Sequence, residues 1–125
     1  MKTGMEVRDR AWRLLNYTDS DGRIDTTMYA DVAARSLALV NQVYADIVYA
    51  VCRTGFKELA ALGDEIDLPE HIVNDVMPYG VAMLLAGAEG DATAQSLFSY
   101  AYNQKRAGGV KSTRRIADRM PRGEW

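Results

Sequence analysis

The chain has 125 residues, of which 48% are hydrophobic and 26% charged, and its formal net charge is −2. This length suits a single domain, and the apolar fraction excludes a wholly disordered chain. No apolar run approaches the roughly 20 residues of a membrane span, and no signal-peptide core follows Met1, so we expect a soluble protein of the cytoplasm. The single cysteine, Cys52, cannot form an internal disulfide, so no oxidising compartment is implied.

The charge is unevenly distributed along the chain. Residues 105–125 contain seven basic and two acidic residues, a net charge of +5, whereas residues 1–104 contain eight basic and fifteen acidic residues, a net charge of −7. A basic tail beside an acidic body is typical of a protein whose tail binds phosphate or an acidic protein surface. A solvated, frayed terminus is the alternative interpretation.

Helical periodicity begins near the N-terminus. Residues 5–16 predict an amphipathic helix whose apolar face contains Met5, Trp12 and Leu15. Residues 17–25 are rich in Asp, Ser and Gly, which favour side-chain to backbone hydrogen bonds, and they predict a turn.

The longest periodic segment spans residues 26–54. Its apolar residues recur at steps of three and four, which predicts a helix of roughly 28 residues and about 42 Å at 1.5 Å per residue. We expect this helix to be the central packing element, and Gly55 stands where a glycine commonly ends a helix. Residues 56–62 predict two further helical turns.

The second half of the chain predicts two more helices. Asp67 can cap the first, with Pro69 in its opening turn and Glu70 in the capping-box position. Pro78 lies inside the periodic run, where it removes a backbone donor, so we expect a kink or a break between two helices there. Asp91 can cap a last helix that continues to about Arg106.

The glycine pair 108–109 is expected to end the helical body. The sequence thus predicts an all-α fold, a small bundle of four to five helices with one long central helix and a basic C-terminal extension. It divides into a helical domain over residues 1–106 and a basic, flexible C-terminal arm over residues 107–125.

Residues 19–25 resemble the middle of an EF-hand calcium loop, because carboxylates alternate around Gly22. Aligning that glycine with the invariant glycine of the motif places Tyr17 at the first ligand position and Met28 at the terminal glutamate position. A loop that lacks both ends has too few charged oxygens for tight binding. A turn followed by a helix cap is the interpretation that the sequence favours.

Catalytic and metal-binding patterns are weak. His71 is the only histidine, and with Asp75 it forms at most half of a metal site, so a solvated surface pair is favoured. Cys52 lacks an orienting base nearby, and the acidic run of residues 64–70 suits a loop between helices as well as it suits catalytic carboxylates. We therefore expect no enzymatic activity, no metal and no cofactor.

Five segments together resemble a known family. They are the turn from Tyr17 to Gly22, the helical run Val40-Asn41-Gln42-Val43-Tyr44, the stretch Leu62 to Glu70, the stretch DVMPYGVAMLLAGAEGDA from Asp75 to Ala92, and SLFSYAYNQKR from Ser96 to Arg106. This order is similar to that of the small α-helical head–tail connector proteins (adaptor or head-completion proteins) of tailed siphophages and their prophages. The resemblance covers roughly residues 5–106.

The resemblance implies a structural protein of the virion. Such connectors form a ring of about a dozen copies below the portal protein of a filled capsid, extend the DNA channel, and give the tail-completion or stopper protein a docking surface. It implies no catalysis, no cofactor, no membrane and no sequence readout of the DNA. The protein would lie in the host cytoplasm before assembly. A C-terminal extension typically reaches into the portal, and residues 107–125 would match it.

The basic residues of that extension are the candidate binding residues, for portal carboxylates or for DNA phosphates. They are Lys111, Arg114, Arg115, Arg119 and Arg122. The alternative function is a small nucleic-acid-binding helical protein that acts through this tail. Against it, the body is acidic and no recognition-helix pattern is present.

Overall fold

The computed structural model describes the backbone of residues 2–51 and 56–119, and the side chains up to Gly109 together with that of Lys111. Within these ranges the chain forms five helices, and its β-structure is limited to one isolated bridge between Thr3 and Glu65. The helices are α1 (Gly4–Leu14), α2 (Ala30–Ala50), α3 (Glu70–Asp75), α4 (Met77–Ala88) and α5 (Ala92–Arg119). The predicted all-α bundle is confirmed.

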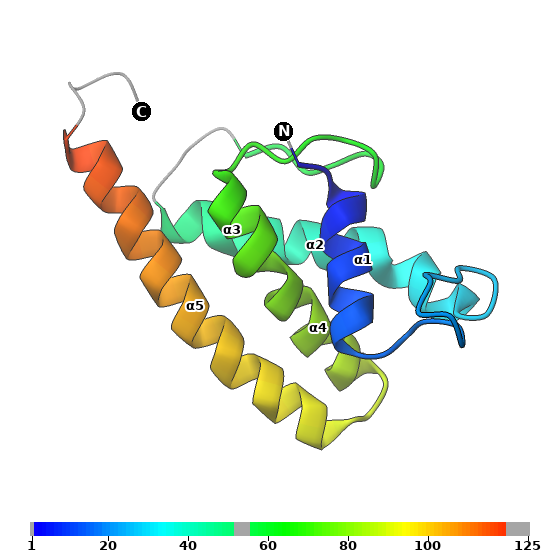
Figure 1. Cartoon of the computed structure of the whole chain (residues 1–125). Coiled ribbons are helices and arrows are strands. Elements are labelled where there is room, and N and C mark those ends of the chain that lie inside the picture. The colour runs from blue at the N-terminus through cyan, green and yellow to red at the C-terminus, as the bar shows by residue number, and fades with distance from the viewer. Residues whose placement is uncertain (1, 52–55, 120–125) are drawn as a thin grey trace.

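Helix α4 lies at the centre of the bundle and packs against each of the other four helices (Figure 1), so the prediction that the helix of residues 26–54 is the central packing element is wrong. Its sequence, MPYGVAMLLAGA, contains no charged residue, so every side of it tolerates burial. Small residues on α4, among them Gly80 and Ala86, are buried and allow neighbouring helices to approach closely. The short α3 precedes it, and α5 runs along one side of the molecule (Figure 1).

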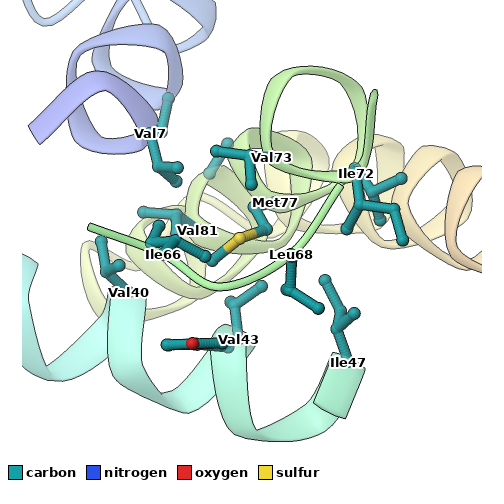
Figure 2. Packing of buried hydrophobic residues seen from close by; sticks show 14 of the residues in the cluster. Val7, Val40, Val43, Ile47, Ile66, Leu68, Ile72, Val73, Met77 and Val81 are labelled. Atoms are coloured by element: carbon teal, nitrogen blue, oxygen red, sulfur yellow. The ribbon is translucent and has the colours of Figure 1, made fainter. Parts of the chain in front are cut away.

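The hydrophobic core joins α1, α2, α3 and α4 with the segment that precedes α3. Figure 2 shows Met77 among side chains from all of these elements, including Val7, Val43 and Ile66. Each of these four side chains is at most 2% exposed. Burying an aliphatic side chain stabilises a fold by about 1.5–3 kcal/mol, so this cluster is the main stabilising feature of the molecule.

The segment from residue 56 to residue 69 is not helical, so the prediction of two helical turns over residues 56–62 is wrong. Its backbone bonds to other parts of the chain instead: the N–H of Met5 donates to the Leu62 carbonyl at 2.8 Å, and the N–H of Ile66 donates to the Lys2 carbonyl at 2.8 Å. Three side chains of this segment are buried in the core: Leu59, Ile66 and Leu68. Tertiary bonds and burial have outweighed local helix propensity here.

Helix α2 is shorter than predicted at its start. The Asp25 carboxylate accepts the backbone N–H groups of Thr27 and Met28, each at 3.0 Å, which stabilises a turn over residues 26–29 before the helix begins at Ala30. Gly55, expected to end this helix, lies outside the described residues, as does Cys52.

The remaining helix boundaries divide into confirmed and wrong predictions. The break at Pro78 is confirmed, because α3 ends at Asp75 and α4 carries the proline in its first turn. The cap by Asp91 is also confirmed, since its carboxylate accepts the Ala94 N–H at 3.0 Å. The cap by Asp67 is wrong, because α3 begins after Pro69 without a side-chain cap.

Helix α5 continues through Gly108 and Gly109 to Arg119, so the prediction that this glycine pair ends the helix is wrong. Helix α5 has 28 residues and is the longest helix within the described part of the chain. The residues expected to form the C-terminal arm thus begin as a continuation of this helix.

Candidate interaction surfaces

The predicted partner-binding residues lie at the C-terminal end of the described chain. The backbone of α5 includes Lys111, Arg114, Arg115 and Arg119, and the Lys111 side chain is exposed. The side chains of the three arginines are outside the described part, and Arg122 lies beyond it altogether. The helix nevertheless places Lys111, Arg115 and Arg119 at steps of four residues, about one helical turn each.

The first half of α5 is attached to α2 by a polar cluster. The Tyr102 hydroxyl donates to Asp46 Oδ2 at 2.6 Å, and Arg106 Nε lies 2.9 Å from the same oxygen. Burial raises the pKa of Tyr102 well above its ordinary value, and the hydrogen bond to Asp46 raises it further. Tyr102 therefore remains a protonated donor, and the cluster holds this part of α5 in place.

Helix α5 also packs closely on α4 at Gly80. A Cβ atom at Gly80 would lie 2.7 Å from Tyr102 Cε1 and 3.0 Å from Val43 Cγ1, closer than such atoms normally approach. Glycine at this position therefore permits the contact among α2, α4 and α5.

A basic hollow lies between α1, the α3–α4 junction and α5. Its volume is about 220 Å³, and it is lined by Arg10, Arg13, Leu14, Asn74, Asp75, Pro78, Tyr79 and Lys105. Three of these residues are cations and one is an acid. Lys105 Nζ lies 4.7 Å from the centroid of the Tyr79 ring, a cation–π contact. We use the name basic hollow for these eight residues.

An acidic loop, residues 56–69, lies beside the N-terminus (Figure 1). It contains four acidic residues, Glu58, Asp64, Glu65 and Asp67, and one basic residue, Lys57. The Asn41 side chain from α2 binds both backbone groups of Leu59: its Oδ1 accepts the N–H at 2.7 Å and its Nδ2 donates to the carbonyl at 3.0 Å. The loop is therefore fixed to the body although it has no regular secondary structure.

A third surface is an open apolar groove of about 440 Å³ between α2, α4 and α5, lined in part by Met83 and Leu84. Tyr49 borders it and is 85% exposed. Asp46 and Tyr102 are engaged with each other at its wall. The groove therefore offers apolar area without convergent free polar groups.

In the segment that resembles a calcium loop, the Asp19 carboxylate binds backbone N–H groups of its own turn. Asp19 Oδ1 accepts the N–H groups of Asp21 and Arg23, each at 2.9 Å, and Gly22 has a φ of 78°. The prediction of a turn is confirmed. In the described ranges no group of three or more His, Cys, Asp or Glu side chains is arranged to hold a metal ion.

The other candidate chemical residues are dispersed. His71 and Asp75 are exposed, one turn apart on α3. Asp64 Oδ2 accepts the N–H groups of Ala60 and Ala61 at 2.9 and 3.0 Å, so this carboxylate shapes a turn. Among the described residues, no helix has the length and apolar character needed to cross a lipid bilayer.

Sequence reasoning missed two features of α1. Arg8 is buried, with Nη2 at 2.7 Å from Asp9 Oδ1 and its guanidinium carbon 5.2 Å from the Trp12 ring centroid, whereas Met5 on the predicted apolar face is 43% exposed. Arg10 and Arg13 were not recognised as part of a site, because Lys105 joins them only through the fold. Their spacing of three residues on an amphipathic helix was the available signal.

Comparisons of the sequence and the structure with protein-family models, with curated proteins and with solved structures give no match. The sequence motifs and the surfaces described above are therefore the basis for inferring what the chain does.

Proposed function

We propose that this protein is a head–tail connector of a tailed siphophage or prophage. In this role about a dozen copies form a ring below the portal, extend the DNA channel, and offer a docking surface to a tail-completion or stopper protein. The observation that carries the proposal is the ordered series of motifs over residues 5–106, which resembles this family. The protein would act in the virion, after a period in the host cytoplasm.

The residues that carry the resemblance define how the helices join. The LPE motif ends where α3 begins at Glu70, and MPYG opens the central helix α4. In the EGD motif, Gly90 has a φ of 77° between α4 and α5, a conformation that favours glycine, and Asp91 caps α5. Such residues specify the shape of a packing unit, which supports a structural role.

The distribution of charge also supports an interaction protein. The last turns of α5 carry Lys111, Arg114, Arg115 and Arg119, while most of the acidic residues belong to the body. In a connector, this end of α5 would engage portal carboxylates, or phosphates of DNA that passes without sequence readout. Long-range attraction between complementary surfaces speeds association and selects partners.

The experiment is co-expression with the portal protein of the same genome, followed by affinity purification and electron microscopy. A connector co-purifies with the portal and appears as an added ring on its lower face. Charge reversal at Lys111, Arg114 and Arg115 should weaken co-purification, whereas Arg23→Glu, on an exposed turn, should leave it unchanged. A wild-type chain that ignores the portal would overturn the proposal.

Nucleic-acid binding through the tail is the second candidate function. The observation that favours it is the continuation of α5 as a helix through four basic residues within nine positions. Duplex DNA binding that falls steeply with salt, and is lost on the same triple charge reversal, would support it. Undetectable binding at low salt would remove it.

A further inference from the structure

We propose that the acidic loop of one copy docks onto the basic hollow of a second copy. The inference rests on the proposed ring-forming function, and it names the two surfaces that join neighbouring subunits. The contact is head-to-tail, because the two surfaces are different parts of the same molecule.

The basic hollow has an excess of positive charge that no ion pair among the described residues compensates. Arg10 and Arg13 are exposed and have no ion pair within the described part of the chain. Lys105 contacts the face of Tyr79, which leaves its charge unneutralised. Asp75 is the one acid in the lining, so the hollow carries a net charge of +2.

The acidic loop presents carboxylates from a fixed backbone. Glu58 and Glu65 are exposed, and neither forms an ion pair with another described residue. The bonds from Asn41 to Leu59 and from Met5 to Leu62 hold the loop in one conformation. A surface that is ordered before binding loses less conformational entropy when a partner docks.

Among the described residues, no ion pair joins the loop to the hollow of the same chain. Glu65 is bridged to Thr3, just before the first turn of α1. Arg10 and Arg13 lie seven and ten residues farther along, about 10 and 15 Å at 1.5 Å per residue. Exposed charges farther apart than about 8 Å are largely screened at physiological ionic strength. The two surfaces therefore complement each other between molecules.

The hollow has a size and lining that suit glutamate side chains. Its volume is about 220 Å³, and it is open to solvent on one side. Leu14 and Tyr79 are half-buried and supply apolar surface for the methylene groups of a glutamate, and the arginines can form paired hydrogen bonds with its carboxylate. Phosphate would engage the arginines but gain nothing from the apolar part of the lining.

A contact between two different surfaces has a geometric consequence. A two-fold dimer uses the same patch on both subunits, whereas a head-to-tail contact repeats and produces a closed ring or an open filament. Loop-to-hollow docking is therefore the kind of contact that a connector ring requires.

The test uses two variants of the full chain, one with the charge of the hollow reversed and one with the charge of the loop reduced. The hollow variant is Arg10→Glu with Arg13→Glu, and the loop variant is Glu58→Gln with Glu65→Gln. Because all four side chains are exposed, both variants should retain the helical circular dichroism spectrum of the wild type. Arg23→Glu is the matched control, an exposed arginine outside both surfaces.

Sedimentation velocity at high protein concentration and low salt measures the outcome. The wild type and the control should associate into species larger than a dimer, at least tenfold more strongly than either variant alone. A mixture of the two variants should form a one-to-one dimer that does not grow. In that mixture each pair has one intact hollow facing one intact loop, while the acidic altered hollow and the altered loop, which keeps a small negative charge, do not attract each other and cannot continue the chain.

Three results would overturn the inference: a wild type that is monomeric at every concentration, a variant that associates like the wild type, or a mixture that remains monomeric. DNA binding that is lost in the hollow variant while self-association is unchanged would also overturn it, in favour of a phosphate ligand. The portal experiment separates this inference from the proposed function. Variants that still form normal rings on the portal exclude this contact only, whereas a wild type that self-associates but ignores the portal excludes the connector role.

Discussion

The acidic loop is irregular but hydrogen-bonded to the rest of the molecule, whereas helix α5 is regular but extends beyond its contacts with the body. The loop has no helix or strand, yet backbone and side-chain hydrogen bonds join it to α2 and to the residues around the start of α1. Helix α5 is regular over 28 residues, but the polar contacts that Tyr102, Lys105 and Arg106 make with the body lie before its glycine pair. Secondary structure alone therefore does not identify which part of this molecule is fixed.

This difference bears on function. A fixed irregular loop can present carboxylates in a defined arrangement, as a docking surface requires. A helix that extends past its attachment can carry basic residues toward a separate partner. The predictions below alter first the attachments of the loop, then those of α5, and last the extension itself.

Asn41→Ala should have the largest effect. It removes both hydrogen bonds to the buried Leu59 and leaves its backbone N–H and C=O without these partners. The expected loss in the free energy of unfolding is about 2–3 kcal/mol, and hydrogen exchange should accelerate over residues 56–69. Urea denaturation and amide exchange measure the two effects.

Gln42→Ala is the control for this prediction, because Gln42 is the exposed neighbour on α2. Its effect should be within about 0.5 kcal/mol. Equal losses in the two variants would contradict the role of Asn41 as the link between α2 and the loop.

Gly80→Ala should destabilise the protein by about 2 kcal/mol, as overpacking of a close helix contact does. The added methyl group would lie 2.7 Å from Tyr102 Cε1. The urea midpoint should fall, and the near-ultraviolet circular dichroism of the tyrosines should change. An unchanged midpoint would show that α4 and α5 are not in close contact.

Tyr102→Phe should cost about 1 kcal/mol, because one hydrogen bond to Asp46 is lost while Arg106 remains beside that carboxylate. The pKa of Tyr102 is raised in the folded protein. Its contribution to stability is therefore complete below its ordinary pKa of about 10 and declines as the pH rises above it. Wild type and variant should differ in the slope of stability against pH between about 10 and 12, and parallel curves would contradict this assignment.

The sequence predicted those features of the fold that depend on neighbouring residues. Asp91 binds an N–H three residues away, and Pro78 interrupts a helix through its own ring. Both boundaries were predicted correctly for that reason. Residues 56–62 have helical periodicity, but their conformation depends on Met5 and Asn41, which are distant in sequence, so no local pattern could reveal it.

The candidate surfaces were less predictable than the helices. The excess of basic residues after position 104 is visible by counting, and so is the run of acids near position 65. The basic hollow is not, because Arg13 and Lys105 are brought together only by the packing of α1 and α5 around the α3–α4 junction. The burial of Arg8 could not be predicted from the sequence for the same reason, because it depends on where α1 packs.

Gly108→Ala should have the smallest effect on stability. Whether it stabilises or destabilises the protein tests the extension of α5. A methyl group at Gly108 meets no atom within 4 Å, whereas one at Gly109 would lie 3.2 Å from Val76 Cγ2. Replacing a glycine inside a helix by alanine stabilises it by about 0.5–1 kcal/mol. Gly108→Ala should therefore raise the helical circular dichroism signal and the urea midpoint, and Gly109→Ala should raise them less. If both substitutions leave helicity unchanged, the glycine pair interrupts the helix after all, and the basic residues beyond it belong to a separate arm.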